Sequence, residues 1–310
     1  MSRLADGALR LGYRVGWTLA CRVPEGWVAR IAARTSRRTR RRNGQHVQTL
    51  RRNLAAATGA PVTDALVEAG LASYLRTLYE VLALPGWSAE QAVGRVSTVG
   101  EDILRSAFAA GGAVVALPHS GNWDLAGAWA CRTGMPVTTV AEQLADAEFR
   151  AFARFRQGLG MEVISQRDPG TVPALAGAIR QGRLVCLVAD RDLGRAGLPV
   201  TWRGQPVTMP AGPAMVARRT GAALIPAVCH YTPTGMTIVF GPVVAHQPGR
   251  SGLEAMTQQV ADFFAARIAE HPEDWHMMQP FFGQNRGPAS PETAGPAPTS
   301  PGTATRKAHR

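Results

Sequence analysis

In the middle of the chain, segments with two different spacings of apolar residues alternate. Residues 113–117, 184–189 and 223–229 are short runs that are apolar almost throughout, as in strands buried on both faces. Residues 101–110 and 125–132 instead place apolar side chains three or four positions apart, which favours helices. The alternation predicts an α/β fold with a mostly parallel central sheet flanked by helices. Further strands are expected at 137–140, 163–164 and 237–240, and further helices at 146–158, 172–181, 213–220 and 254–271.

The first 90 residues carry helical patterns, which predict an N-terminal helical extension of this core. Residues 62–84 have leucines on one side of a helix that ends at Pro85 and Gly86. Residues 1–20 form an apolar stripe with arginines between its members. This segment is expected either to lie on a membrane surface or to pack on the core, and both interpretations are open at this stage.

Three parts of the chain are expected from these patterns. Residues 1–90 are expected to be a helical, membrane-facing part that is continuous with an α/β core over residues 91–284. Residues 285–310 are rich in Pro, Gly, Ala, Ser and Thr and contain too few large apolar side chains to build a core. We therefore expect this tail to be disordered and assign it no catalytic role.

The charge balance of the 310-residue chain is strongly basic, with 34 Lys and Arg against 22 Asp and Glu. A net charge of +12 attracts anionic lipid, nucleic acid or phosphorylated ligands. Residues 34–52 are rich in arginine but contain few aromatic residues. Proteins that bind single-stranded nucleic acid by base stacking need aromatic side chains. Since no nucleic-acid-binding motif is recognised either, we expect lipid or phosphate groups, and no nucleic acid, as partners.

The cysteines and the hydropathy pattern exclude several other classes of protein. Cys21, Cys131, Cys186 and Cys229 are widely separated and show no zinc-ligand spacing with histidines, so neither a metal site nor a disulfide framework is expected. The pattern predicts neither a secretory signal nor a run of about 20 apolar helical residues. Any membrane contact is therefore expected to be peripheral.

A histidine and an aspartate occupy the turn that follows the apolar run 113–117. The segment reads Pro-His-Ser-Gly-Asn-Trp-Asp, with His119 and Asp124 four residues apart between a strand and a helix. Such turns lie at the carboxyl ends of strands, where open α/β sheets bind ligands. Asp124 is expected to reach one imidazole nitrogen and leave the other as a general base. The N–H groups of Gly121 and Asn122 are candidates for holding an oxyanion, so Asn122 is a substrate-binding candidate.

The chemistry expected at this turn is direct activation of a hydroxyl. Ser120 adjoins His119, but no Gly-x-Ser-x-Gly nucleophile elbow occurs in the chain. Without an activated nucleophile, a histidine base would deprotonate an acceptor alcohol in a single transfer step. A purely structural histidine remains an alternative on these residues alone.

A second polar segment, Asp190-Arg-Asp-Leu-Gly, follows the apolar run 184–189. Arg191 or Arg195 is a candidate for contacting an anionic group of a substrate. A structural ion-pair network among Asp190, Arg191 and Asp192 is the alternative interpretation.

Taken together, three segments resemble a known family. They are His119-Ser-Gly-Asn-Trp-Asp124, Asp190-Arg-Asp-Leu-Gly194 and the loop and helix from Gly212 to Pro226, and they occur in family order. The family is the lysophospholipid-acyltransferase-like superfamily, in its lipid A acyltransferase branch. Within that branch the chain is most similar to the actinobacterial phosphatidylinositol mannoside acyltransferases, on Val140-Ala-Glu142 and on the ending His271-Pro-Glu-Asp-Trp-His-Met-Met-Gln279.

This resemblance implies an acyl-CoA-dependent enzyme that acylates a mannose hydroxyl of phosphatidylinositol mannosides. It implies that His119 is the base, that Asp124 is its partner, and that Glu142 helps to bind or position a sugar. Acyl-CoA is then a co-substrate, no resident cofactor is needed, and the protein acts at the cytoplasmic face of the plasma membrane. The stretch from Leu198 to Gln205 lacks acidic residues that some relatives carry there, so no role is transferred to it.

Three other functions are open at this stage. One is a lipid A-like or lysophospholipid acyltransferase, which differs only in its acceptor. The second is a nucleic-acid-binding protein that uses residues 34–52. The third is a membrane-surface scaffold without catalysis, which would tolerate the loss of both His119 and Asp124.

Overall fold

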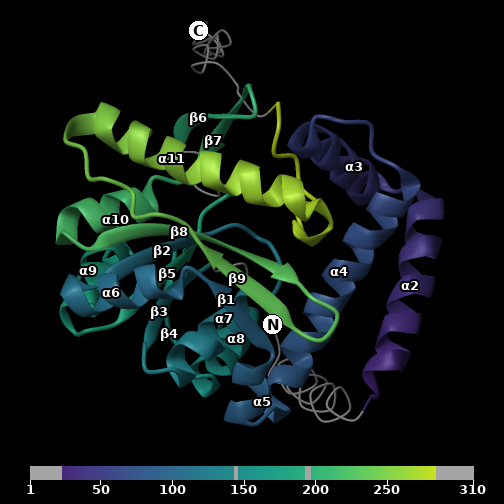
Figure 1. The fold of residues 1–310 in the computed structure, drawn as a ribbon, viewed down its shortest axis with the longest axis horizontal. Coiled ribbons are helices and arrows are strands. Elements are labelled where there is room, and N and C mark those ends of the chain that lie inside the picture. Colours follow the sequence, from purple (N-terminus) through teal and green to yellow (C-terminus); the bar gives the residue numbers. More distant parts are fainter. Residues whose placement is uncertain (1–22, 143–145, 193–196, 284–310) are drawn as a thin grey trace, which may run out of the picture.

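The computed structural model describes residues 23–142, 146–192 and 197–283, and within them a seven-stranded sheet forms the centre (Figure 1). Every neighbouring pair is parallel except β8 and β9, so the predicted α/β class with a mostly parallel sheet is confirmed. In spatial order the strands are β1 (Val96–Val99), β9 (Met236–Phe240), β8 (Ala223–Tyr231), β2 (Ala113–Leu117), β5 (Leu184–Val188), β3 (Val137–Ala141) and β4 (Glu162–Ser165).

Helices cover both faces of this sheet. Successive side chains of a strand point to opposite faces. In β2, Val114 and Ala116 pack against α9 (Thr171–Arg180), α10 (Gly212–Thr220) and α11 (Gly249–Glu270). Val115 and Leu117 face the other layer, formed by α6 (Glu101–Gly111), α7 (Trp123–Arg132) and α8 (Asp146–Gly158). The central strands are therefore apolar on both faces, which explains their continuous apolar runs.

Among the described residues, the longer helices before the sheet are α2 (Glu25–Arg42), α3 (Gln45–Thr58) and α4 (Asp64–Ala83). Helices α2 and α4 lie side by side on one flank of the molecule (Figure 1). Arg40 of α2 donates to Glu68 and Asp64 of α4, at 2.6 Å each, so one member of the basic segment holds two helices together. Residues 1–20 and 285–310, for which an amphipathic helix and a disordered tail are expected, lie outside the described residues.

Helix α4 begins and ends close to the predicted limits, but among the leucines of its predicted apolar side only Leu71 is buried, with 6% exposed. The side chains that it buries include Ser73, Thr77 and Glu80, whereas Leu78 is 45% exposed. The polar side is buried because it makes hydrogen bonds to the turn that follows β2 and to the C-terminal segment. The leucine side therefore stays available to line a pocket.

Several short elements were not predicted: β1, α5 (Ala89–Gly94), β6 (Leu198–Trp202) and β7 (Gln205–Met209). Strands β6 and β7 form an antiparallel hairpin with the two-residue turn Arg203-Gly204. Both turn residues have positive φ, as two-residue hairpin turns require, but arginine stands where Asn, Asp or Gly usually marks such a turn. Pro199 and Pro206 lie within the two strands, and because proline is rare in strands the sequence did not indicate β6 and β7.

Candidate active site

The turn between β2 and α7 is held by its own buried polar groups. Asn122 caps α7, since its Oδ1 accepts from the N–H of Leu125 at 2.9 Å. Its Nδ2 donates to Glu80 of α4 at 3.0 Å, and the residue is fully buried. Both ends of its side-chain amide are thus engaged in fixing the turn, and substrate binding through the backbone N–H of Asn122 stays a prediction.

Gly121 also has a structural role in this turn. Its φ is +56°, and a Cβ there would lie 2.8 Å from the Cβ of Cys229, so only glycine fits. Its N–H donates to the carbonyl of Asp274 at 3.0 Å. This N–H is consequently not an oxyanion donor, contrary to the expectation from the sequence.

His119 is hydrogen-bonded to Asp190, not to Asp124. Its Nδ1–H donates to Oδ1 of Asp190 at 2.6 Å, and its backbone N–H donates to Oδ2 at 2.9 Å. The indole N–H of Trp275 donates to the same Oδ2 at 2.9 Å. Because Nδ1 carries the proton, Nε2 keeps its lone pair and has the form of a general base.

Asp190 is fully buried, yet it is suited to the anionic form. Burial by itself raises the pKa of this carboxyl. The charge of a protonated His119 and the hydrogen bonds from His119 and Trp275 outweigh burial and hold the pKa of Asp190 below its ordinary value. A buried carboxylate at this position orients the imidazole and stabilises the cation that forms when His119 takes a proton.

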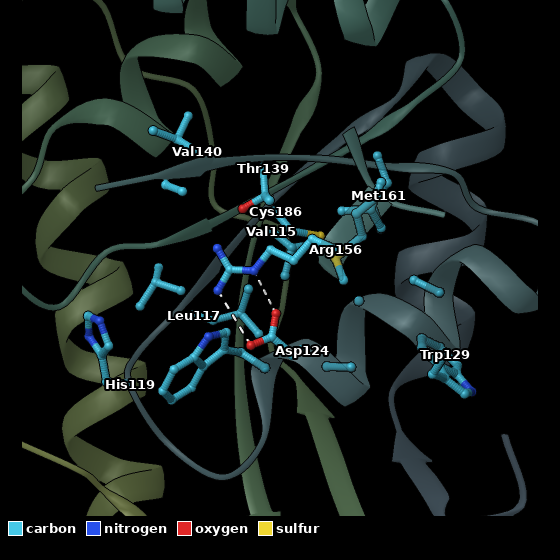
Figure 2. A pocket seen from close by; sticks show the side chains of 18 of the residues that line it. Val115, Leu117, His119, Asp124, Trp129, Thr139, Val140, Arg156, Met161 and Cys186 are labelled. Atoms are coloured by element: carbon cyan, nitrogen blue, oxygen red, sulfur yellow. Dashed lines mark hydrogen bonds and ion pairs between the residues drawn. The ribbon is translucent and has the colours of Figure 1, made fainter. Parts of the chain in front are cut away.

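Asp124 forms an ion pair with Arg156 of α8 instead. The guanidinium donates to both carboxylate oxygens, at 2.7 and 3.4 Å (Figure 2). Burial lowers the pKa of Arg156, but the nearby Asp124 raises it more, so the guanidinium stays charged. The expected pairing of Asp124 with His119 is corrected accordingly: Asp124 joins α7 to α8 beside the histidine.

Two apolar pockets meet at His119. The first, which we call the inner pocket, has a volume of about 300 Å³ and lies between α7, α8 and the side chains of β2, β3 and β5. Figure 2 shows His119 on one side of it and Trp129 and Met161 on the other. The second, which we call the α4 pocket, has a volume of about 580 Å³ and lies between α4, α8 and residues 276–279. The two share His119, Trp123, Asp124, Phe152, Arg156 and Arg191.

Two of the other predicted residues lie at the same place. Glu142 lines the inner pocket and Arg191 lines both pockets, with 3.9 Å between the guanidinium and the carboxylate. They come together because β3 and β5 are neighbours and both residues follow the carboxyl ends of these strands. Arg195 lies outside the described residues.

A second histidine borders the α4 pocket and was not predicted. Residues 274–276 run antiparallel to residues 119–121, and the N–H of His276 donates to the carbonyl of His119 at 2.8 Å. Between these contacts, Trp275 stacks on Trp202 of the hairpin with ring centres 5.6 Å apart. The C-terminal segment thus supplies both a donor to Asp190 and part of a pocket wall.

The buried His276 makes stability depend on pH. Burial lowers the pKa of its imidazole from 6.5 to about 3, with a smaller lowering by His119 and an opposing effect of Asp190. As the pH falls below about 6.5, the unfolded chain takes up this proton and the folded chain does not, so stability is lost toward pH 3.

We expect the free energy of unfolding to fall by about 1.4 kcal/mol more per pH unit in the wild type than in His276→Phe between pH 5.5 and 4. Urea unfolding at three pH values measures this difference. Parallel pH dependences of the two proteins would contradict it.

Among the described residues there is neither a candidate metal site nor a candidate membrane-spanning helix. In this part of the chain, no three His, Cys, Asp or Glu side chains are grouped to hold a metal ion. Among the helices of the same residues, none combines the length and the apolarity that a membrane crossing requires.

Comparison with known proteins identifies the class of enzyme that carries this sheet and site as the acyltransferases. The model of the bacterial lipid A biosynthesis acyltransferases matches residues 7–284, and the chain belongs to this family. It is 42% identical over 279 residues to the phosphatidylinositol mannoside acyltransferase of Mycolicibacterium smegmatis, covering 87% of this chain and 90% of the relative. It is also 42% identical to the phosphatidylinositol mannoside acyltransferase of Mycobacterium tuberculosis, over 86% of each chain.

Proposed function

We propose that this enzyme transfers a long acyl chain from acyl-CoA to a mannose hydroxyl of a phosphatidylinositol mannoside. The observation that carries the proposal is the position of His119. Its Nδ1 is fixed by a buried carboxylate, and its ring lies where two apolar pockets meet. The names of the two relatives support the acceptor, and the apolar pockets suit two substrates that both carry hydrocarbon chains.

The reaction follows from the tautomer of His119. Nε2 takes the proton of the acceptor hydroxyl as its oxygen attacks the thioester carbonyl, and a new C–O bond forms. The C–S bond then breaks, and the imidazolium returns the proton to the leaving thiolate. Asp190 keeps Nδ1 protonated throughout and stabilises the imidazolium. No covalent enzyme intermediate is required.

The inner pocket is the proposed site of the donor's acyl chain. Its walls are apolar side chains of the sheet and of α7, among them Val115, Leu117 and Trp129. Along β5 it extends from Val188, beside the histidine end, to Leu184, a distance of about 13 Å at about 3.3 Å per residue. A chain lying there would present its thioester to His119.

Filling the far end of the inner pocket is expected to shift the preferred donor length. Ala130 is 3% exposed and lines the pocket about two turns along α7 from Trp123. In Ala130→Phe, the ring displaces chain methylenes that contribute about 0.8 kcal/mol each, which is about fourfold in affinity. We expect kcat/KM for the longest acyl-CoA to fall at least about tenfold relative to short donors.

Rates with a series of acyl-CoA lengths measure this shift. Ala110→Phe, on the exposed side of α6, is the matched control and is expected to keep the wild-type profile. An unchanged length profile in a folded Ala130→Phe protein would contradict the assignment of the inner pocket.

The α4 pocket and its charged rim are the proposed site of the acceptor. Arg191, which lines both pockets, is placed to bind a phosphate. Glu142 lines the inner pocket, and its carboxylate lies 3.9 Å from the Arg191 guanidinium, so we propose that it accepts hydrogen bonds from sugar hydroxyls where the two pockets meet. The net charge of +12 favours an anionic membrane surface. We therefore place the enzyme as a peripheral protein on the cytoplasmic face of the plasma membrane, where it draws its acceptor from the bilayer.

A panel of acceptors tests this function. Purified enzyme is given radiolabelled acyl-CoA with phosphatidylinositol mannosides, lysophospholipids or lipid A precursors, each in vesicles of the same composition. Label is expected in the phosphatidylinositol mannoside, and its rate of incorporation is expected to fall at least about 10²-fold when His119→Ala is used. Preferential labelling of a lysophospholipid or of a lipid A precursor would overturn the proposed acceptor.

A further inference from the structure

His276 stands out among the polar residues of the α4 pocket because one of its nitrogens has no hydrogen-bond partner among the described residues. The residue is 9% exposed, its ring lines the pocket, and Nδ1 is buried without a hydrogen bond. The mechanism proposed above does not use this side chain. A buried polar atom without a partner is rare in folded proteins and calls for an explanation.

The other nitrogen fixes the form of the ring. Ser73 has one hydroxyl proton and donates it to Oδ1 of Asp274 at 2.6 Å. Its oxygen lies 3.0 Å from Nε2 of His276, so this contact requires Nε2–H to donate to Ser73. Oδ2 of Asp274 accepts from the N–H of Tyr231 at 2.7 Å, which holds the carboxylate in place.

The unpaired Nδ1 is therefore an acceptor. With the ring proton on Nε2, Nδ1 carries a lone pair, and the lowered pKa of His276 keeps the ring neutral at physiological pH. A neutral acceptor lone pair is complementary to a hydroxyl group. It repels a phosphate or carboxylate oxygen, which also presents lone pairs.

We propose that Nδ1 of His276 accepts a hydrogen bond from a second hydroxyl of the acceptor, a different one from the hydroxyl that is acylated. This inference rests on the proposed function and specifies how the same site recognises its substrate. His276 is then a binding residue for a polyhydroxylated ring, a sugar or an inositol. It distinguishes such an acceptor from a simple alcohol, which has only the hydroxyl that His119 activates.

The surroundings of His276 suit this role. Its backbone N–H is bonded to the carbonyl of His119, so the two histidines border one pocket side by side. The ring of Trp123 is 5.4 Å from that of His119 and 6.3 Å from that of His276, which gives a sugar an aromatic wall between them. Nδ1 is buried in this structure, so the proposed contact requires a local side-chain movement. Met277 and Met278 line the same pocket, and methionine side chains are flexible.

Kinetics of His276→Phe test the proposal. One neutral hydrogen bond is worth a factor of about 3 to 10 in affinity. We expect KM for the phosphatidylinositol mannoside to rise by that factor, with KM for acyl-CoA and kcat unchanged. His276→Gln, whose amide keeps a donor for Ser73, is expected to show the same rise and serves if the phenylalanine variant does not fold.

The matched control is His246→Phe. This imidazole bonds to the carbonyl of Ala222 and lines neither pocket, so its replacement is expected to leave both KM values unchanged. Acceptors that lack one ring hydroxyl at a time identify the bonded group. One of them is expected to raise KM in the wild type and to have no further effect in His276→Phe.

Two outcomes separate this inference from the proposed function. An unchanged acceptor KM in folded His276→Phe, or additive effects of the variant and every deoxy acceptor, would overturn the role of His276 while acyl transfer itself stands. If the wild type transfers no acyl group to any glycolipid, nitrogen NMR still tests the site. It is expected to show a protonated Nε2 and a bare Nδ1 in His276, with a shift of Nδ1 when methyl mannoside is added. A protonated Nδ1, or no shift, would refute the assignment.

Discussion

Replacement of His119 by alanine is expected to lower kcat for acyl transfer by a factor of about 10² to 10⁴, the usual contribution of a general base. The fold is expected to persist, because the side chain is 30% exposed and makes its side-chain hydrogen bond to Asp190 alone among the described residues. The measurement is the initial rate of label transfer from acyl-CoA at saturating acceptor, beside circular dichroism of the same sample.

His246→Ala is the control for this experiment, because it removes an imidazole that lies outside both pockets. It is expected to keep the wild-type rate. A folded His119→Ala protein with a near-wild-type rate would show that the base is elsewhere, and the mechanism would be wrong.

The second large effect is expected at Asp190. In Asp190→Asn, the side chain no longer holds Nδ1–H through a charged oxygen, and the imidazole is free to adopt the tautomer with its proton on Nε2. We expect kcat to fall about 10²-fold or more, with KM for acyl-CoA little changed, because the variant removes stabilisation of the imidazolium and not a contact with the donor. Steady-state kinetics measure both constants.

Asp124→Asn is the matched comparison, with the same change of group on the neighbouring carboxylate. It leaves the buried Arg156 without its counter-charge, so the expected loss is about 3 kcal/mol in the free energy of unfolding. Its effect on kcat is expected to be smaller than that of Asp190→Asn. If Asp124→Asn kept its stability and lost more of kcat than Asp190→Asn, the orienting carboxylate would be Asp124 after all.

The sequence identified the histidine but not its partner, for a physical reason. The apolar run of β2 and the polar turn after it are local features, so the position of His119 at a strand end could be predicted. The partner depends on which strand lies beside β2. That strand is β5, about 70 positions further along, and hydrophobic patterns do not record the order of strands. Asp124 was preferred because it is close in sequence.

For other residues too, roles that depend on neighbouring residues could be predicted, and positions that depend on distant segments could not. The capping role of Asn122 could have been found, because Asn directly before an apolar helical pattern is a usual helix start. His276 could not be placed, because its position depends on the C-terminal segment returning to the turn of His119. Arg191 could be expected near the carboxyl end of a strand, whereas Glu142 was expected only from the family resemblance; both line the inner pocket together with His119. Their roles stay predictions.

The central claim is that the donor chain lies in the inner pocket and meets the acceptor at His119. A crystal structure with a non-hydrolysable acyl-CoA analogue tests it most directly. We expect density for the acyl chain between α7 and β5, with the group that replaces the thioester beside Nε2 of His119. An acyl chain in the α4 pocket, or one whose reacting end lies away from His119, would contradict it.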